Sequence, residues 1–211
     1  MNYELMNNNK VYLCGTIAKE GVLSHSYFGE NFYEYQFSVP RLSQSYDLIP
    51  VIISERIINN TKLTIGSKVS VVGQYRSFNK LENGKSKLML SVFARDIVEN
   101  DDTQNPNQVI LNGYVCKGPV YRTTPFKREI CDVLIAVNRA YNKSDYIPCI
   151  AWGRNARYVN NFKVGDKIEI VGRIQSRDYQ KKTEDENFET KTAYEISITR
   201  INIEEEKEKE S

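Results

Sequence analysis

The segment that decides the fold runs from Val133 to Tyr179 and reads VLIAVNRAYNKSDYIPCIAWGRNARYVNNFKVGDKIEIVGRIQSRDY. Apolar residues alternate with polar ones near its two ends, which predicts strands, and polar clusters separate these runs. Between them, Ala156, Val159 and Phe162 fall on one face of a short helical stretch that begins at Arg154. The segment therefore predicts strand, loop, strand, short helix and strand, in that order.

Four segments of the first half of the chain recur in the second half in the same order, three at an offset of 98 residues and one at 99. The pairs are KVYLCGTI (10–17) with QVILNGYV (108–115), FSVPR (37–41) with IAVNR (135–139), LIPVI (48–52) with YIPCI (146–150), and GSKVSVVGQ (66–74) with GDKIEIVGR (165–173). Matches in one order at nearly one spacing indicate a tandem duplication.

A polar, acidic stretch, ENDDTQNPN (99–107), separates the two copies and has the composition of a linker. Each copy then has about 100 residues, which is a common domain size. We expect an N-terminal domain over 1–100, a linker over 101–106, a C-terminal domain over 107–203 and an acidic tail over 204–211.

Strand patterns dominate both halves, with one short helix between the third and fourth strands. In the first half, the counterpart of the helix is expected within Ser54 to Leu63, with Ser54 as its N-cap. This order is typical of the five-stranded Greek-key barrel of the OB type. An immunoglobulin-like sandwich would need about seven strands and no such helix. We therefore expect an all-β protein of two tandem OB-fold barrels.

Several protein classes are disfavoured by composition. Hydrophobic residues make up 40% of the chain, enough for packed cores, but no apolar run approaches the length of a membrane span. The first ten residues, MNYELMNNNK, lack the apolar core of a signal peptide, so we expect a cytoplasmic protein.

Catalytic and metal chemistry have little support in the sequence. Cys14, Cys116, Cys131 and Cys149 show no CxxC spacing and lie singly in apolar runs, which favours small buried side chains over a disulfide or a zinc site. His25 is the one histidine and lies in a polar Ser-His-Ser loop. We expect no enzyme activity, no metal and no cofactor.

Aromatic residues in the second half lie where strands end and loops begin, and Arg and Lys are interleaved with them. Residues 107–203 carry 16 Lys and Arg against 11 Asp and Glu, an excess of five, whereas residues 1–100 carry 11 against 9. Aromatic rings can stack on bases while basic residues track a phosphate backbone. This combination favours nucleic-acid binding by the second half.

From Gln108 to about Ile203, the sequence resembles the bacterial single-stranded DNA-binding proteins. The matching stretches are VILNGYV, PVYRTTP, IAVNRAY, SDYIPCIAWGRNARYV and KVGDKIEIVGRIQSRDY, followed by the closing strand. The first half resembles the family only in its framework, through KVYLCGTI, FSVPR, LIPVI and GSKVSVVG.

The resemblance implies specific roles for residues of the second half. The positions where the family stacks bases are Tyr141, Tyr146, Trp152 and Tyr179, and the accompanying basic positions are Arg122, Arg139, Arg154, Arg173 and Arg177. Each role has a structural alternative: Trp152 ends a core strand, Tyr179 could pack within a hairpin, and any single Arg could be a solvated surface charge.

The first half lacks this set of aromatic residues. The repeat offsets place Ser43, Leu48, Ser54 and Lys80 at the four stacking positions. A different surface could replace them, and its candidate residues are Tyr46, Tyr75, Arg76 and Phe78. The aromatic hairpin containing Tyr27, Phe28, Phe32 and Tyr33 is an alternative.

The family resemblance implies a protein that coats single-stranded DNA, largely without sequence preference, in replication, recombination or repair, in the cytoplasm at the nucleoid. By analogy with tandem-barrel members, we expect a homodimer with four OB folds, whose edge-strand pairing involves the first strands, 10–17 and 108–115. The acidic end, EEEKEKES, lacks the terminal apolar residue with which family members dock replication and repair enzymes, which leaves such partners open.

Three alternatives remain at this point. The chain could be an OB-fold interaction module of a replication or primosome complex with weak affinity for DNA. A nuclease on the same barrel would need a carboxylate cluster, whereas the acidic residues are scattered in turns. RNA remains open as a ligand, because stacking surfaces do not by themselves read the 2′-hydroxyl.

Overall fold

The computed structural model describes residues 7–61, 63–82, 84–100, 105–182 and 188–204. Strands account for most of this chain because apolar and polar residues alternate along them. In β7 (Glu129–Arg139), for example, Val133, Ile135 and Val137 are buried, and the residues between them face outward.

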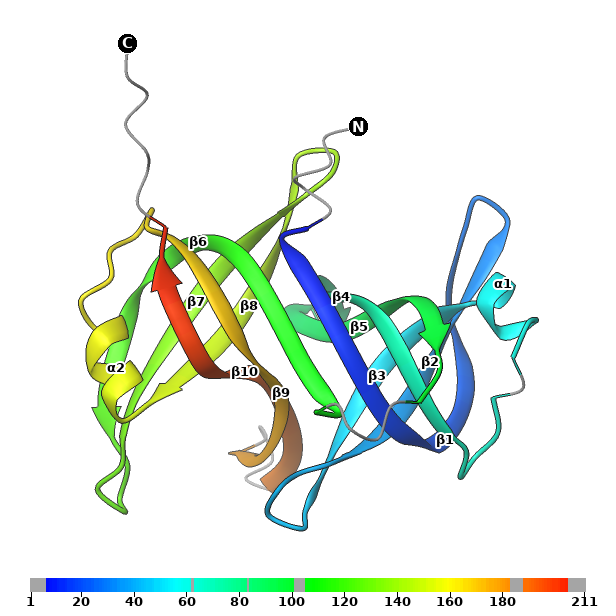
Figure 1. Cartoon of the computed structure of the whole chain (residues 1–211), viewed down its shortest axis with the longest axis horizontal. Helices are drawn as coiled ribbons and strands as arrows, with labels where there is room; N and C mark the ends of the chain where they lie inside the picture. The colour runs from blue at the N-terminus through cyan, green and yellow to red at the C-terminus, as the bar shows by residue number, and fades with distance from the viewer. Residues whose placement is uncertain (1–6, 62, 83, 101–104, 183–187, 205–211) are drawn as a thin grey trace.

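The first half forms a closed five-stranded barrel (Figure 1). Its strands are β1 (Asn9–Tyr27), β2 (Glu30–Pro40), β3 (Tyr46–Ser54), β4 (Lys68–Glu82) and β5 (Lys85–Val98). Strand β1 pairs with both β2 and β4, and a short parallel pairing of β3 with β5 closes the barrel. This is the Greek-key order of an OB fold.

The second half repeats this topology. Its strands are β6 (Asn107–Thr123), β7, β8 (Lys143–Trp152), β9 (Lys167–Lys182) and β10 (Phe188–Ile203). Here β6 pairs with β7 and β9, and a parallel β8–β10 pairing closes the barrel. Two tandem OB barrels, as the sequence predicted, are thereby confirmed.

Each barrel also has the predicted short helix between its third and fourth strands: α1 (Glu55–Ile58) and α2 (Arg154–Val159). Ala156 and Val159 of α2 are buried against the second barrel, whereas α1 buries no residue. Ser54 occupies the N-cap position of α1, but its side chain makes no capping hydrogen bond, so its predicted capping role is wrong.

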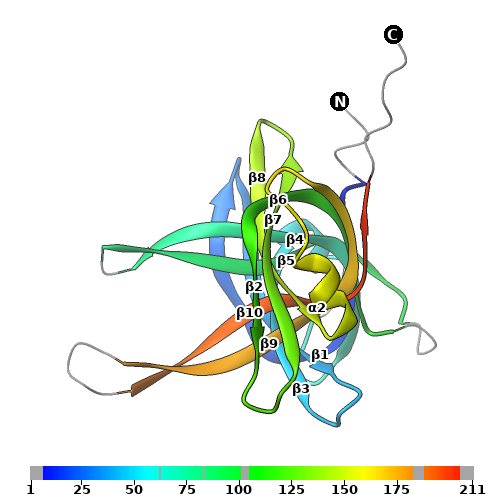
Figure 2. The same cartoon turned by 90° about the vertical axis from the view of Figure 1, so that its left-hand side faces the viewer.

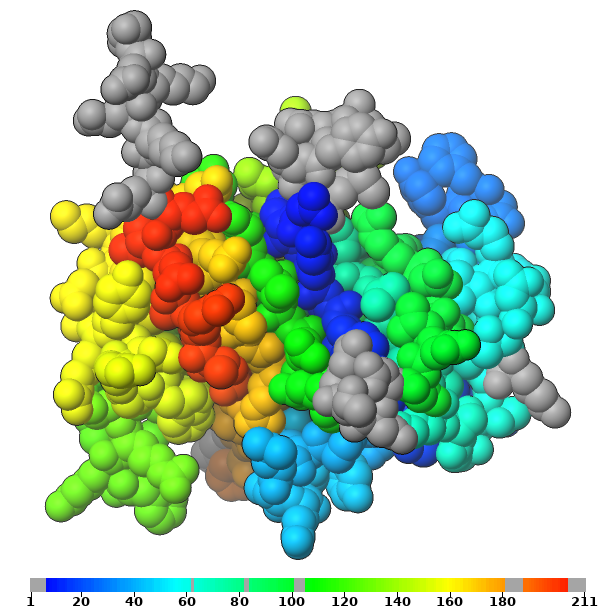
Figure 3. Space-filling view, in the orientation of Figure 1, coloured from blue at the N-terminus to red at the C-terminus, as the bar shows by residue number. Residues whose placement is uncertain are grey.

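The two barrels are joined through their first strands. The N-terminal part of β1 pairs antiparallel with that of β6, from Asn9 opposite Leu111 to Leu13 opposite Asn107. The central pair, Val11 and Val109, consists of equivalent residues of the repeat, so the barrels are related by an approximate two-fold axis at this point. In Figure 3, β1 (blue) and β6 (green) run side by side between the barrels.

This pairing corrects one expectation. The first strands were predicted to pair across a homodimer, but within this chain they pair with each other. The physical reason is that duplication places both copies of the edge on one chain, where pairing needs no second molecule. Any homodimer must therefore use another surface.

A repeated asparagine fixes each first strand to its neighbour. The Asn9 side chain donates to the Tyr75 carbonyl at 2.7 Å and accepts from the Tyr75 amide at 2.8 Å. Asn107 makes the same pair of bonds with Ile174, at 2.7 and 2.9 Å. Both asparagines are buried, and buried amides are stable only when they are hydrogen-bonded.

The β4–β5 and β9–β10 hairpins project from the same side of the molecule (Figure 2). The four cysteines carry free thiols, three of them buried and Cys116 half-buried. Residues 101–104 of the predicted linker and 205–211 of the predicted tail lie outside the described residues. Among the residues that are described, no helix has the length and apolar character that crossing a membrane requires.

Candidate nucleic-acid interface

Strand β8 carries the centre of the predicted stacking surface. Ile147, Cys149 and Ala151 point into the core, so Tyr146, Pro148 and Trp152 lie on the outer face of the barrel. Tyr146 is 47% exposed and Trp152 is 38% exposed. Both rings are therefore half-buried against the barrel and half open to solvent, as a ring that stacks on a ligand must be.

The two other predicted rings flank this strand. Tyr141 lies in the turn between β7 and β8, is 90% exposed and has a positive φ of 62°. A tyrosine with this backbone conformation is uncommon and marks a tightly constrained turn. Tyr179 lies on β9 opposite Lys191 of β10, toward the outer end of the β9–β10 hairpin, and is 38% exposed.

The predicted arginines fall into two groups. Arg122 is paired with Asp132 at 2.7 Å, Arg139 with Asp145 at 3.5 Å and Arg173 with Asp47 at 3.9 Å, so a carboxylate already offsets part of their charge. Arg154 and Arg177 are exposed, and no carboxylate of the described chain forms an ion pair with either. These two offer the least compensated charge beside the aromatic residues.

Two buried aspartates, which the sequence reasoning missed, connect the barrels. Asp47 of β3 accepts hydrogen bonds from the backbone amide and hydroxyl of Ser176 in β9, at 2.6 and 2.9 Å. Reciprocally, Asp145 of β8 accepts from the amide of Ser77 in β4 at 2.7 Å. We call these contacts the Asp47–Ser176 and Asp145–Ser77 clasps. Their signal in the sequence was an Arg followed six residues later by Asp in each copy, at 41 and 47 and at 139 and 145.

The two clasps differ in their electrostatics. Burial raises the pKa of Asp47, but hydrogen bonds from Arg41 (Nε to Oδ2, 2.7 Å) and Ser176 outweigh it, and the net pKa lies below the ordinary value. Burial also raises the pKa of Asp145, and here the Ser77 amide and the charges of Arg139 and Arg76 offset it only in part. The pKa of Asp145 therefore stays above the ordinary value.

The clasps also position the aromatic surface. Tyr146 directly follows Asp145, and its backbone amide donates to the Ser77 hydroxyl at 2.8 Å. We call the exposed aromatic row on β8, Tyr146 and Trp152, the platform. The platform is therefore tied to β4 of the first barrel at Tyr146, the residue where the row begins.

One of the four expectations for the first half, Tyr75, is wrong. Tyr75 is fully buried, because alternation along β4 points it into the core, and burial raises its pKa well above the ordinary value. A ring in this position cannot stack on a base. Arg76 packs over the Phe93 ring at 3.9 Å, and burial lowers its pKa to about 10, which still leaves it charged at neutral pH. Tyr46 and Phe78 are 65% and 46% exposed and remain available.

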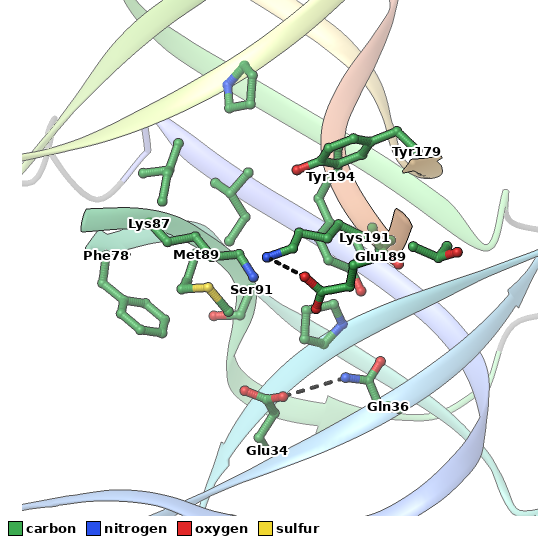
Figure 4. Close-up of a pocket in the computed structure, with 17 residues that line it drawn as sticks. Glu34, Gln36, Phe78, Lys87, Met89, Ser91, Tyr179, Glu189, Lys191 and Tyr194 are labelled. Atoms are coloured by element: carbon green, nitrogen blue, oxygen red, sulfur yellow. Dashed lines mark hydrogen bonds and ion pairs between the residues drawn. The ribbon is translucent and has the colours of Figure 1, made fainter. Parts of the chain in front are cut away.

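A groove of about 630 Å³ lies between the barrels (Figure 4). Its walls come from β2 and the β4–β5 hairpin of the first barrel, and from β8 and the β9–β10 hairpin of the second. Phe78, Tyr179 and Tyr194 supply aromatic rings, and Pro148 links the groove to the outer face of β8.

No group of three His, Cys, Asp or Glu residues that could hold a metal is found in the part of the chain that is described.

Comparison with known proteins supports the resemblance seen in the sequence. Residues 106–203 match the Single-strand binding protein family. Single-stranded DNA-binding protein 1 of Staphylococcus aureus is 37% identical over 81 residues, which cover 35% of this chain and 48% of that protein. Single-stranded DNA-binding protein A of Bacillus subtilis is 36% identical over the same length and is covered to 47%. The chain thus spans about half the length of the curated relatives that it matches.

The solved structures extend the likeness to both barrels. The wild-type single-stranded DNA-binding protein from Thermus aquaticus superposes with a TM-score of 0.71 at 20% identity, covering 93% of each chain. A deletion mutant of the same protein superposes with a TM-score of 0.69 at 21% identity, and the match covers 94% of this chain and 95% of that one. At this identity the match establishes the shared tandem OB fold.

Proposed function

We propose that this chain binds single-stranded DNA, largely without sequence preference, by stacking bases on aromatic rings and neutralising phosphates. The observation that carries the proposal is the outward row on β8, where Tyr146 and Trp152 are half-exposed within the half that matches the family. Stacking on such rings is sequence-tolerant because every base has a π-face. Tyr141 and Tyr179 would extend this row at its two sides.

Among the basic residues, Arg154 and Arg177 are proposed as the main phosphate contacts, because both are exposed and neither is paired with a described carboxylate. Arg122, Arg139 and Arg173 would contribute less, since each already faces an aspartate. Arg154 lies two residues after Trp152 and Arg177 two residues before Tyr179, so both can contact the phosphates of a DNA strand that stacks on those rings.

The proposed cellular role is the coating and protection of single strands in replication, recombination or repair, at the nucleoid, with no catalysis by this chain. The proposed division of the chain is into two domains, 1–100 and 107–203, with a linker over 101–106 and a tail over 204–211. A homodimer with four OB folds is also proposed, formed through a surface other than the paired first strands. Light scattering should then give twice the chain mass of 24.4 kDa, and a monomer mass at micromolar concentration would contradict the dimer.

Substitution of Tyr146 tests the stacking mechanism. Tyr146→Ala removes a ring worth about 1–3 kcal/mol of stacking, so affinity for oligo-dT should fall about 5- to 150-fold. Tyr146→Phe keeps the ring and should bind nearly as well as wild type. Fluorescence anisotropy with labelled oligo-dT measures both variants.

Leu48→Ala is the matched control, since Leu48 occupies the equivalent position of the repeat in the other barrel, is 46% exposed and carries no aromatic ring. Equal affinity of wild type and Tyr146→Ala for oligo-dT would contradict the stacking role. Weak binding by all proteins, wild type included, would favour the alternative of a protein-interaction module.

A further inference from the structure

The groove between the barrels has aromatic side chains from both halves of the chain. Phe78 comes from β4 of the first barrel and Tyr179 from β9 of the second, and Figure 4 places them on opposite sides of the groove. Phe78 lies opposite Met89 in the β4–β5 hairpin, and Tyr179 lies opposite Lys191 in the β9–β10 hairpin. Each wall thus pairs a flat ring with a long, flexible side chain.

The groove is continuous with the aromatic row on β8. Pro148, which lies between Tyr146 and Trp152 on the outer face, also lines the groove. Moreover, the Tyr146 amide is hydrogen-bonded to Ser77, the residue directly before Phe78. A DNA strand that stacks on Tyr146 can therefore continue along the protein surface to the first barrel.

The chemistry of the lining suits unpaired bases better than an apolar ligand. Gln36, Ser91, Thr190 and Thr192 offer hydrogen-bond donors and acceptors among the rings. Lys87 and Lys191 bring positive charge, and Lys191 is held at 3.1 Å from Glu189, whose side chain is 56% exposed. Rings for stacking, and amides and hydroxyls for base edges, are thus present in one channel. The carboxylates of Glu34 and Glu189 balance the charge of its two lysines, so the groove suits bases rather than phosphates.

We propose that one single strand runs from the platform of the second barrel across this groove and stacks a base on Phe78, so that both barrels of one chain bind the same strand. The proposal rests on the proposed function and adds to it the path of the strand. It assigns the first barrel a base contact that does not use Tyr75, whose ring is buried.

Binding measured as a function of oligonucleotide length tests this path. Wild type, Phe78→Ala and Leu81→Ala are titrated with labelled oligo-dT from a few nucleotides to a few tens of nucleotides. Leu81 is the matched control, because it lies on the same strand, is 74% exposed and does not line the groove. For long oligonucleotides, Phe78→Ala should lose about tenfold in affinity, the expected loss for one stacked base.

The shortest oligonucleotides that bind should show no loss, because they occupy only the second barrel. Phe78→Tyr should restore the affinity for long strands, and Leu81→Ala should match wild type at every length. If Phe78→Ala unfolds at a lower temperature than wild type, photo-crosslinking of wild type to single-stranded DNA that contains bromodeoxyuridine gives an independent readout. Adducts are then expected on the peptide that contains Phe78.

The outcomes separate this proposal from the proposed function. Loss of long-strand affinity in Phe78→Ala alone supports the path across the groove. Tight binding with equal affinities for wild type and Phe78→Ala at all lengths overturns the path and leaves the platform of the second barrel in place. Absence of oligo-dT binding by wild type overturns both.

Discussion

Asp47 and Asp145 occupy equivalent positions in the repeat, yet their carboxylates have opposite effects on stability. Asp47 faces Arg41 and Ser176, and its lowered pKa means that its ionised form stabilises the fold at neutral pH. This contribution is present above the ordinary carboxyl pKa and is lost as pH falls through the lowered value. The raised pKa of Asp145 has the opposite sign: its contribution is present at low pH and is lost as pH rises through the raised value.

Asp47→Asn should lower the free energy of unfolding at pH 7 by about 2–3 kcal/mol, because Arg41 and Ser176 lose a charged acceptor. Urea unfolding measures the difference. It should shrink as the pH falls through the lowered pKa of Asp47, where wild type also carries a neutral side chain.

Asp132→Asn is the control, since this carboxylate is 38% exposed and pairs with Arg122 at the surface. Asp132→Asn should lower the free energy of unfolding by less than about 1 kcal/mol. Equal losses for the two variants would show that the Asp47–Ser176 clasp contributes no more than a surface pair.

At the scale of the strands, each barrel depends on close packing between its last two strands. Gly172 of β9 lies where an added Cβ would be 2.4 Å from the Ser197 carbonyl oxygen of β10. At its counterpart Gly73, an added Cβ would be 2.2 Å from the Phe93 carbonyl oxygen of β5. Both belong to the repeated segments GSKVSVVGQ and GDKIEIVGR, so this contact occurs in both copies of the duplication.

Gly172→Ala should destabilise the chain by about 1–3 kcal/mol, because the backbone of β10 must move to admit the methyl group. Gly118→Ala is the matched control, since a Cβ there has no neighbour within 4 Å and the backbone conformation suits any residue. Urea unfolding should place Gly118→Ala within about 0.5 kcal/mol of wild type. A similar small change for Gly172→Ala would contradict the close packing of β9 against β10 at this position.

The strands and helices were the part of the fold that the sequence predicted best. Alternation and the repeat located the barrels, and the apolar face of 154–162 located α2, because these patterns depend on local periodicity. The inward orientation of Tyr75 was missed, since one residue of register decides which face of a strand is buried. That register is set by pairing with β5, which the local sequence does not contain.

At the scale of the whole molecule, the chain is built like a symmetric dimer whose two subunits have been joined. The β1–β6 pairing and the two clasps are reciprocal, as expected for an isologous interface. None of these contacts was predicted within one chain, because they join residues more than 60 positions apart through side chains that look ordinary in isolation. The positions of Arg139 and Arg173 at this interface were missed for the same reason.

The aromatic residues of the second half illustrate how far a family resemblance carries a site prediction. Tyr141, Tyr146, Trp152 and Tyr179 all reach the surface, and their binding role remains a proposal. The groove beside them was not predicted, since half of its lining comes from the other barrel. A site formed between two domains becomes visible only when the domains are placed together.

The most direct test of the account is a titration of the intrinsic fluorescence of Trp152, the one tryptophan, with oligo-dT at low and high salt. Stacking of a base on a half-exposed indole should quench its emission strongly. The affinity should fall as salt rises, with a logarithmic slope of about −0.7 for each phosphate neutralised. Unchanged fluorescence and no binding at low salt would contradict the proposed function, and binding without quenching would contradict the platform on β8.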